Sequence, residues 1–539
     1  MQMIRPSIIA RNAAVTSPNY LASQTGLKIL QNGGNAIHAA IAMAATLSVV
    51  YPHMNGIGGD NFWLVYNSND QKLKGINASG RSGEKASIMY YRQLGYDSIP
   101  MRGHLAANTV PGALSGWVEA YHYADTHTNQ KIEWANLLED AIDYAANGFP
   151  VTKSQIKMAE SFLVNKMIDD RNDFDAIFIQ PIRNGLKVGD LFYQKDLART
   201  LRRVAEDKGR SFYSGTIAEQ IERSCRIKGV LTKQDFHYHT ADWIDPICTQ
   251  YRDYVACNLP PNTQGIASLS ILNILNQYDL STISEHDPEY YHLIIEATKL
   301  AFELRDKWVT DPGQIEVPLD QLLSDSYGKK MADQIDDSIS RKYQPLLDPK
   351  GDTVWLGVVD QWGNAVSMIQ SIYHEYGSAV VPEGTGVLLQ NRGSFFSLQE
   401  DELNRLEPRK RPFHTLNPAM LFKQNRPYLI YGTMGGEGQP QTQAAIVTKL
   451  VDYGYYVQQA LDAPRWLYGR TWGAVSNSLK VEKRISPAVL EALVNKGHKV
   501  EVVSDYSDLM GHAGAIKIND ANIKFAGSDP RSDGLALGY

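Results

Sequence analysis

The stretch from Gly351 to Ser371 constrains the fold of this chain more than any other. Residues 354–359 are apolar and rich in β-branched side chains, which predicts a buried strand. Gly363 and Asn364 then supply turn residues, and residues 365–372 predict the returning strand of a hairpin. The sequence therefore predicts a core β-hairpin that directly follows a Gly-Asp-Thr triplet.

Thr353 combines a hydroxyl group with a position that favours self-cleavage. It follows Gly351 and Asp352, where the chain can bend tightly enough for the hydroxyl to attack the preceding carbonyl. Cleavage of the Asp352–Thr353 bond would give Thr353 a free amine with a pKa of about 8, which can act as general base for the adjacent hydroxyl. The alternative is a threonine that only begins a strand, and this is the commoner role of a single threonine.

Several motifs in one order make the region 353–397 resemble the catalytic core of the γ-glutamyltransferase family of N-terminal nucleophile hydrolases. These motifs are Thr353, Val358-Val359-Asp360, Gly363-Asn364-Ala365-Val366-Ser367, Gly377-Ser378, Gly384-Thr385-Gly386, Asn391 and Phe396-Ser397. Glycine-rich segments at 33–36 and 56–59, together with the C-terminal residues, extend the resemblance over nearly the whole chain. The family implies an α+β fold: a four-layer αββα sandwich with two central antiparallel sheets.

The resemblance also implies a zymogen that cleaves itself between Asp352 and Thr353. Cleavage would divide the chain into a large subunit, residues 1–352, and a small subunit, residues 353–539. Both carry predicted strands, so we expect them to stay interleaved in one domain, and a homo-oligomer of such heterodimers is possible. The polar segment 336–350 suits a mobile linker before the cleavage site.

The resemblance assigns catalytic roles to five residues. Thr353 is the nucleophile, and Gly435 and Gly436 supply backbone N–H groups to the oxyanion. Ser371 stands where the family has a second threonine that hydrogen-bonds the nucleophile, and Asn391 is expected to orient the same group of residues. The implied chemistry is acyl transfer to water and needs no cofactor and no metal.

The expected substrate pocket departs from the family pattern. Where γ-glutamyl enzymes hold an α-amino group with an Asn, a Gln and an acidic residue, this chain has Tyr373, Arg392 and Phe395. An ammonium group beside Arg392 would meet a like charge. Arg81 matches the family's carboxylate-binding arginine, and two family serines align with a histidine and a threonine. The residues expected to bind substrate are Arg81, Tyr373, Arg392, His414 and Thr415.

The variant motifs at 371–375, 390–393 and 412–415 resemble a branch that includes oxamate amidohydrolase and acylase-like members. A small anionic amide such as oxamate needs a guanidinium and hydroxyls, and no ammonium pocket. The sequence therefore predicts hydrolysis of oxamate to oxalate and ammonia, a step of purine degradation. Two alternatives stay open: a glutathione hydrolase or γ-glutamyltransferase with an altered pocket, and a catalytically inactive relative that only binds.

Composition indicates which other classes of partner the chain is not built to bind. With 43% hydrophobic and 21% charged residues and a net charge of -6, the chain is an ordinary globular sequence with no electrostatic case for nucleic acid. It has no apolar run long enough for a membrane span and no signal-peptide pattern, so we expect a cytoplasmic protein. Cys225, Cys248 and Cys257 form no CxxC and are expected to be reduced. His237 and His239 lack a third metal ligand.

Local patterns predict the other elements around the hairpin. Ser17 as N-cap and Pro18 at the first position predict a helix to about residue 30. His38, at the start of an alanine-rich helix, is interpreted as structural. The further expected elements are helices at 36–50, 267–278, 290–305 and from about Thr442, and strands at 62–66, 419–422 and 428–431.

Overall fold

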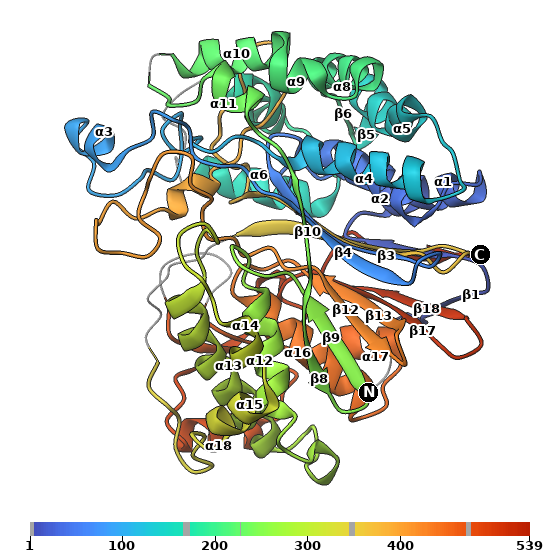
Figure 1. Cartoon of the computed structure of the whole chain (residues 1–539), viewed down its shortest axis with the longest axis vertical. Helices are drawn as coiled ribbons and strands as arrows, with labels where there is room; N and C mark the ends of the chain where they lie inside the picture. The colour runs from blue at the N-terminus through green and yellow to red at the C-terminus, as the bar shows by residue number, and fades with distance from the viewer. Residues whose placement is uncertain (1–4, 165–172, 227, 344–350, 470–475) are drawn as a thin grey trace.

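Two antiparallel sheets lie face to face at the centre of the molecule, and helices cover the outer face of each (Figure 1). The structure is a computed structural model that describes residues 5–164, 173–226, 228–343, 351–469 and 476–539. Within these residues each central sheet has seven strands. The arrangement is the four-layer αββα sandwich that the sequence predicts.

Both sheets combine strands from either side of Thr353. The first sheet has the order β19-β2-β10-β11-β3-β4-β7, with bounds Leu535–Gly538, Ala14–Ser17, Asp352–Val359, Ala365–Tyr373, Asp60–Asn67, Lys72–Ala78 and Asp242–Ile244. The second has the order β1-β18-β17-β13-β12-β9-β8, with bounds Ile8–Ala10, Lys524–Ser528, Ala513–Ile518, Arg426–Thr433, Ala419–Lys423, Tyr254–Asn258 and Ile247–Tyr251. The segments before and after Thr353 therefore share both sheets.

Strands β10 and β11 form the predicted hairpin near the middle of the first sheet. Gly363 has φ +88°, a left-handed conformation that side chains disfavour. Asp360 accepts a hydrogen bond from the Asn364 N–H at 2.9 Å across the turn. Its other carboxylate oxygen accepts from the Ala36 N–H, also at 2.9 Å, so Asp360 fixes both the turn and the start of α2 (Ala36–Val50).

Alternate residues of β10 face opposite layers. Leu356 and Val358 pack into the helical layer, whereas Trp355 and Val359 pack between the two sheets. Thr353 has the same parity as Trp355, so its side chain faces the space between the sheets. The strand thereby places the candidate nucleophile in the interior.

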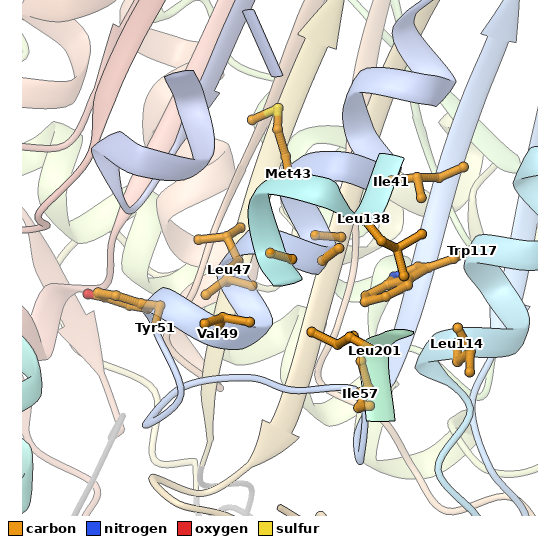
Figure 2. Close-up of a cluster of buried hydrophobic side chains, with 14 of the residues drawn as sticks. Ile41, Met43, Leu47, Val49, Tyr51, Ile57, Leu114, Trp117, Leu138 and Leu201 are labelled. Atoms are coloured by element: carbon orange, nitrogen blue, oxygen red, sulfur yellow. The ribbon is translucent and has the colours of Figure 1, made fainter. Parts of the chain in front are cut away.

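Helix α2 forms the centre of the helical layer over the first sheet, and every one of its residues is buried. Figure 2 shows its Leu47 in a cluster with Trp117 and Leu138, which belong to α4 and α5. His38 completes a capping box with Asn35 at the start of α2, which agrees with its structural interpretation. Helices in this layer include α1 (Tyr20–Gln31), α4 (Ala113–His127), α5 (Trp134–Asn147), α6 (Lys153–Val164), α8 (Lys195–Asp207) and α10 (Thr216–Cys225).

A second helical layer covers the other sheet and holds the core in which α12, α13 and α16 pack together (Figure 1). The predicted helices at 267–278 and 290–305 correspond to α12 and α13. The helices of this layer include α12 (Gly265–Leu275), α13 (Pro288–Trp308), α15 (Asp325–Ala332), α16 (Gly438–Val451), α17 (Val457–Asp462) and α18 (Pro487–Asn495).

Two helices begin elsewhere than the sequence predicts. The N-cap of α1 is Asn19 rather than Ser17, because Ser17 is the last residue of β2. Helix α16 begins at Gly438 rather than near Thr442, and it contains Pro440 in its first turn, where a missing N–H costs no helical hydrogen bond.

The segment predicted as a mobile linker is anchored in its described part, residues 336–343, and residues 344–350 lie outside the described residues. The Ser340 hydroxyl accepts a hydrogen bond from the Lys299 ammonium at 2.6 Å. The Tyr343 hydroxyl donates to Asp306 at 2.6 Å, and both side chains are buried. Two side chains of this part are therefore bonded to α13, and the mobility of the segment stays a prediction.

Cys248 and Cys257 form a disulfide between the paired strands β8 and β9. The prediction that all three cysteines are reduced is wrong for these two, whereas Cys225 is a buried free thiol. The strand pairing places the two cysteines directly opposite each other, which their separation in the sequence does not reveal. In the described residues, no helix has the length and apolar character needed to cross a membrane.

The tight burial of α2 predicts how much the free energy of unfolding falls when one of its side chains is truncated. Leu47→Ala should lower the free energy of unfolding by about 2–5 kcal/mol, because it leaves a cavity in a fully buried helix. Val494→Ala, in the exposed face of α18, should change it by less than about 0.5 kcal/mol. Urea unfolding of both variants measures the difference, and equal midpoints would contradict this description of the core.

Candidate active site

Thr353 lies at an irregularity in the pairing of β10 with β11. Asp352 pairs with Tyr373 and Val354 pairs with Gln370, so two residues of β11 oppose the single residue Thr353. Bulges of this kind redirect side chains and recur beside active sites. Thr353 is fully buried, and its hydroxyl has no hydrogen-bond partner among the described residues. Its Oγ1 is therefore available to a reacting group.

Ser371, one of the two residues opposite Thr353, contacts the peptide bond that precedes the nucleophile. Its hydroxyl donates a hydrogen bond to the carbonyl oxygen of Asp352 and accepts one from the Tyr373 N–H at 2.8 Å. The sequence predicts a bond from Ser371 to Thr353 itself, whereas the contact in this uncleaved chain is with the carbonyl. A donor at this oxygen withdraws electron density from the carbon that Thr353 would attack.

Asn391 holds the chain that leaves β11. Its side-chain carbonyl accepts from the His374 N–H at 3.1 Å, and its amide donates to the Met101 carbonyl at 2.8 Å. Its backbone N–H donates to the Ile372 carbonyl at 3.2 Å. These bonds fix the residues that follow Ser371, so Asn391 acts on the site through the backbone.

Gly435 and Gly436 form the loop between β13 and α16. Their φ angles are +119° and +51°, which explains why both positions are glycine. The Gly435 carbonyl accepts from the Gly438 N–H at 2.7 Å and is thereby turned toward the helix. Because C=O and N–H point in opposite directions across a trans peptide, the Gly436 N–H points away from the helix.

Arg392 forms the centre of a buried cationic pocket. Its guanidinium lies 3.8 Å from the centroid of the Tyr373 ring and donates to the Thr415 hydroxyl at 3.1 Å. Burial lowers the pKa of Arg392 to about 10, although Tyr373 and Asp60 oppose the shift, so the group is charged at neutral pH. Its Nε and Nη1 have no hydrogen-bond partner in the part of the chain that the structure describes. A buried cation with two open donors fits an anion.

His414 and Asp60 form a buried pair beside Arg392. His414 Nε2 and Asp60 Oδ2 are 3.2 Å apart. Burial, followed by the charges of Arg392 and Arg411, lowers the pKa of His414 well below its ordinary value, so the ring is neutral. With Asp60 ionised, Nε2 carries the proton and donates, which leaves Nδ1 as an acceptor. Nδ1 has no partner among the described residues.

Gly351, two residues before Thr353, lies against this group of residues. A Cβ on Gly351 would lie 3.4 Å from the Tyr373 ring and 3.6 Å from the Thr415 hydroxyl. The uncleaved backbone therefore lies against two residues of the cationic pocket.

Comparisons with known proteins show the family to which the chain belongs. A model of the γ-glutamyltranspeptidase family matches residues 22–539. The glutathione hydrolase-like YwrD proenzyme of Bacillus subtilis is 45% identical and the oxamate amidohydrolase proenzyme of Klebsiella pneumoniae is 44% identical, each over 99% of both chains. The chain belongs to the γ-glutamyltranspeptidase family. The crystal structure of cephalosporin acylase from Bacillus halodurans has a TM-score of 0.91 at 36% identity, covering 100% of this chain and 98% of that one.

Membership makes the protein a hydrolase of the N-terminal nucleophile class, and the structure joins several of the residues predicted for its site. Direct contacts join Ser371 to Asp352, and Arg392 to Tyr373 and Thr415. The Arg81 guanidinium pairs with Asp242 at 3.6 Å and is partly exposed.

The sequence analysis missed Asp60 as a member of this γ-glutamyltranspeptidase site. Asp60 begins β3 directly after Gly58 and Gly59, and it accepts hydrogen bonds from the Gly80 N–H at 2.9 Å and the Gln390 amide at 3.0 Å. Its position after two glycines, where backbones pass closely, was the available signal. Phe395, at the place of the family's acidic residue, stacks on Phe413 with ring centroids 4.8 Å apart.

One group of described residues has the composition of a metal site. Ligand atoms of His292, Glu296 and His498 lie within 4.8 Å of one another. These atoms already bond to protein groups: His292 Nδ1 is 2.9 Å from His498 Nε2, and the Lys299 ammonium is 2.6 Å from Glu296 Oε1. The ammonium supplies the positive charge beside the carboxylate, so the group is a hydrogen-bonded network of the protein itself.

The Asp60 environment predicts an unusual titration. Burial raises the pKa of Asp60 from 3.8 to about 6, although bonds from Gly80, Gln390 and Gly112 oppose the shift. A raised carboxyl pKa means that protonation favours the folded state, by about 3 kcal/mol below pH 4, and this contribution is lost as the pH rises through 6. Infrared difference spectra of wild type and Asp60→Asn should show the protonated carboxyl band disappearing near pH 6. A band that disappears near pH 4 would refute the assignment.

Proposed function

We propose that the protein is a self-processing N-terminal threonine amidohydrolase that cleaves the amide of a small carboxylate-bearing substrate such as oxamate. The observation that carries this proposal is Arg392, a buried guanidinium at the centre of the cationic pocket, with two donor atoms that have no partner among the described residues. The names of two relatives, an oxamate amidohydrolase proenzyme and a glutathione hydrolase-like proenzyme, support processing and leave the substrate to be decided by the pocket.

Processing begins with attack of Thr353 Oγ1 on the Asp352 carbonyl carbon. The Ser371 hydroxyl stabilises the developing oxyanion, since it already donates to that carbonyl oxygen. Breaking the C–N bond transfers the hydroxyl proton to the freed Thr353 amine and leaves an ester, which water hydrolyses to the Asp352 carboxylate and the free Thr353 hydroxyl. Residues 1–352 and 353–539 then remain together because they share both sheets.

Turnover uses the new N-terminus. The Thr353 amine takes the hydroxyl proton as Oγ1 bonds to the substrate carbonyl carbon, and the N–H groups of Gly435 and Gly436 hold the oxyanion. The amine returns the proton to the leaving nitrogen, which departs as ammonia. Water then attacks the acyl-enzyme with the same amine as base, releases oxalate from oxamate and restores Thr353.

The pocket favours an anion without an amino group. Arg392 and Thr415 offer donors to a carboxylate, and the neutral His414 offers an acceptor at Nδ1. A γ-glutamyl substrate would bring an ammonium close to the Arg392 cation, and the stacked Phe395 gives it no counter-charge. These contacts favour oxamate over glutathione. Partly exposed Arg81 has no role in this proposal.

Processing is predicted to depend on the hydroxyl groups of Thr353 and Ser371. Thr353→Ala should leave an intact chain without activity, and Thr353→Ser should still cleave because it keeps the hydroxyl. Ser371→Ala should slow cleavage by about 10²–10³-fold through loss of the donor to the Asp352 carbonyl. Mass spectrometry over time measures the fragment that begins at Thr353. Wild-type protein that turns over substrate as an intact chain would rule out this mechanism. The same measurement distinguishes the proposed enzyme from an inactive relative that only binds.

Substrate choice is predicted from the Arg392 charge. Oxamate should be hydrolysed with a higher kcat/KM than glutathione or γ-glutamyl-p-nitroanilide. Arg392→Ala should lower kcat/KM for oxamate by about a hundred- to several-thousand-fold, since a lost buried ionic partner costs about 3–5 kcal/mol. Self-cleavage should be retained, and the surface variant Arg183→Ala should match wild type. A preference for the γ-glutamyl donors would instead identify a glutathione hydrolase with an altered pocket.

A further inference from the structure

Gln264 connects the two loops that the proposed reaction uses. It precedes α12 directly and is fully buried. Its side-chain nitrogen donates to the Thr415 carbonyl at 2.9 Å and to the Gly436 carbonyl at 2.8 Å. Thr415 belongs to the Arg392 pocket and Gly436 to the glycine pair before α16. One amide group therefore holds the carbonyl oxygens of both loops within hydrogen-bonding distance of a single atom.

Arg305 of α13 fixes the orientation of that amide. Its Nη1 donates to Gln264 Oε1 at 3.3 Å, which requires the amide nitrogen to face the loops. Its Nη2 pairs with Glu437 at 3.2 Å, and Glu437 directly follows Gly436. All three side chains are buried. Arg305 thus binds the bridging glutamine and the glycine loop at the same time.

The hydrogen bonds of Gln264 and Arg305 in this network go to other groups than the carbonyl at the cleavage site. The Asp352 carbonyl receives its hydrogen bond from Ser371 on β11, whereas Gln264 and Arg305 contact the loops at 415 and 436–437. Self-cleavage and turnover therefore draw on different donors. A change at Gln264 can weaken turnover and leave processing intact, which a general loss of structure would not do.

We propose that Gln264, oriented by Arg305, is a positioning residue that sets the distance between the carboxylate pocket and the oxyanion loop. It thereby selects substrates by the spacing between their carboxylate and their scissile carbonyl. The proposal rests on the proposed function, because it assigns the two loops to the two ends of one substrate. Oxamate, in which these groups are directly bonded, requires the shortest spacing, and a bridge through one nitrogen atom holds the two loops close together.

The kinetic test compares Gln264→Leu and Gln264→Glu with wild type. The glutamate keeps the size of the side chain but cannot donate to the two carbonyls at neutral pH. Both variants should self-cleave at the wild-type rate, and their kcat for oxamate should fall about 10- to 100-fold with a smaller change in KM. Their preference for oxamate over the longer malonamate and succinamate should decrease. The matched control is Gln458→Leu, because Gln458 is also buried and donates to the Ser528 carbonyl at 2.9 Å, remote from both loops in sequence.

A second measurement tests the bridge without any substrate. Hydrogen exchange in processed Gln264→Leu should accelerate at the amides of residues 414–416 and 435–438, and Gln458→Leu should leave both segments unchanged. Unchanged exchange in either loop would overturn the bridge whatever the substrate is. Self-cleavage that slows in parallel with turnover, or an unchanged length preference, would also overturn it. If wild-type protein does not hydrolyse oxamate, but exchange in both loops is still faster in Gln264→Leu than in wild type, only the proposed substrate would be wrong.

Discussion

The hydrogen bond from the Ser371 hydroxyl to the Asp352 carbonyl is the interaction on which the proposed processing depends. It exists because the pairing of β10 with β11 shifts by one residue opposite Thr353. The hairpin is held in place by Asp360, which binds both its turn and the buried helix α2. The hairpin and the helical layer thus fix the position of the Asp352–Thr353 peptide bond. Its carbonyl accepts a hydrogen bond from Ser371, whereas the Thr353 hydroxyl has no partner among the described residues.

The candidate site has a cationic end and an end formed by backbone. One end holds Arg392 and the neutral His414, both fully buried, and the other is a loop of two glycines in left-handed conformations. In the uncleaved chain, Gly351 lies against Tyr373 and Thr415 at the first end. In the proposed mechanism, cleavage creates the catalytic amine and also gives the segment that ends at Asp352 a free end.

The elements around the candidate site could be predicted from sequence because their signals are local, whereas the roles of its residues were implied by the family resemblance. The hairpin, the α2 helix and the glycine loop each have a period or a turn signal within a few residues. Asp60 and Gln264 could not be predicted in the same way, since each acts through partners far away in the sequence. The disulfide of Cys248 was missed for the same reason, because only the pairing of β8 with β9 makes its partner adjacent. Arg81 was assigned from a local motif match, and a match of this kind does not reveal that its guanidinium pairs with Asp242.

The central claim is that Thr353 carries the acyl group during turnover, and acid-quenched mass spectrometry of the reacting enzyme tests it directly. Oxamate mixed with processed protein should add one oxalyl group to the fragment that begins at Thr353, and peptide mapping should locate it on that residue. The adduct should appear within the first turnover and disappear when substrate is exhausted. An oxalyl group on another residue would contradict the account. So would steady hydrolysis of oxamate during which this fragment is never modified, even when deacylation is slowed.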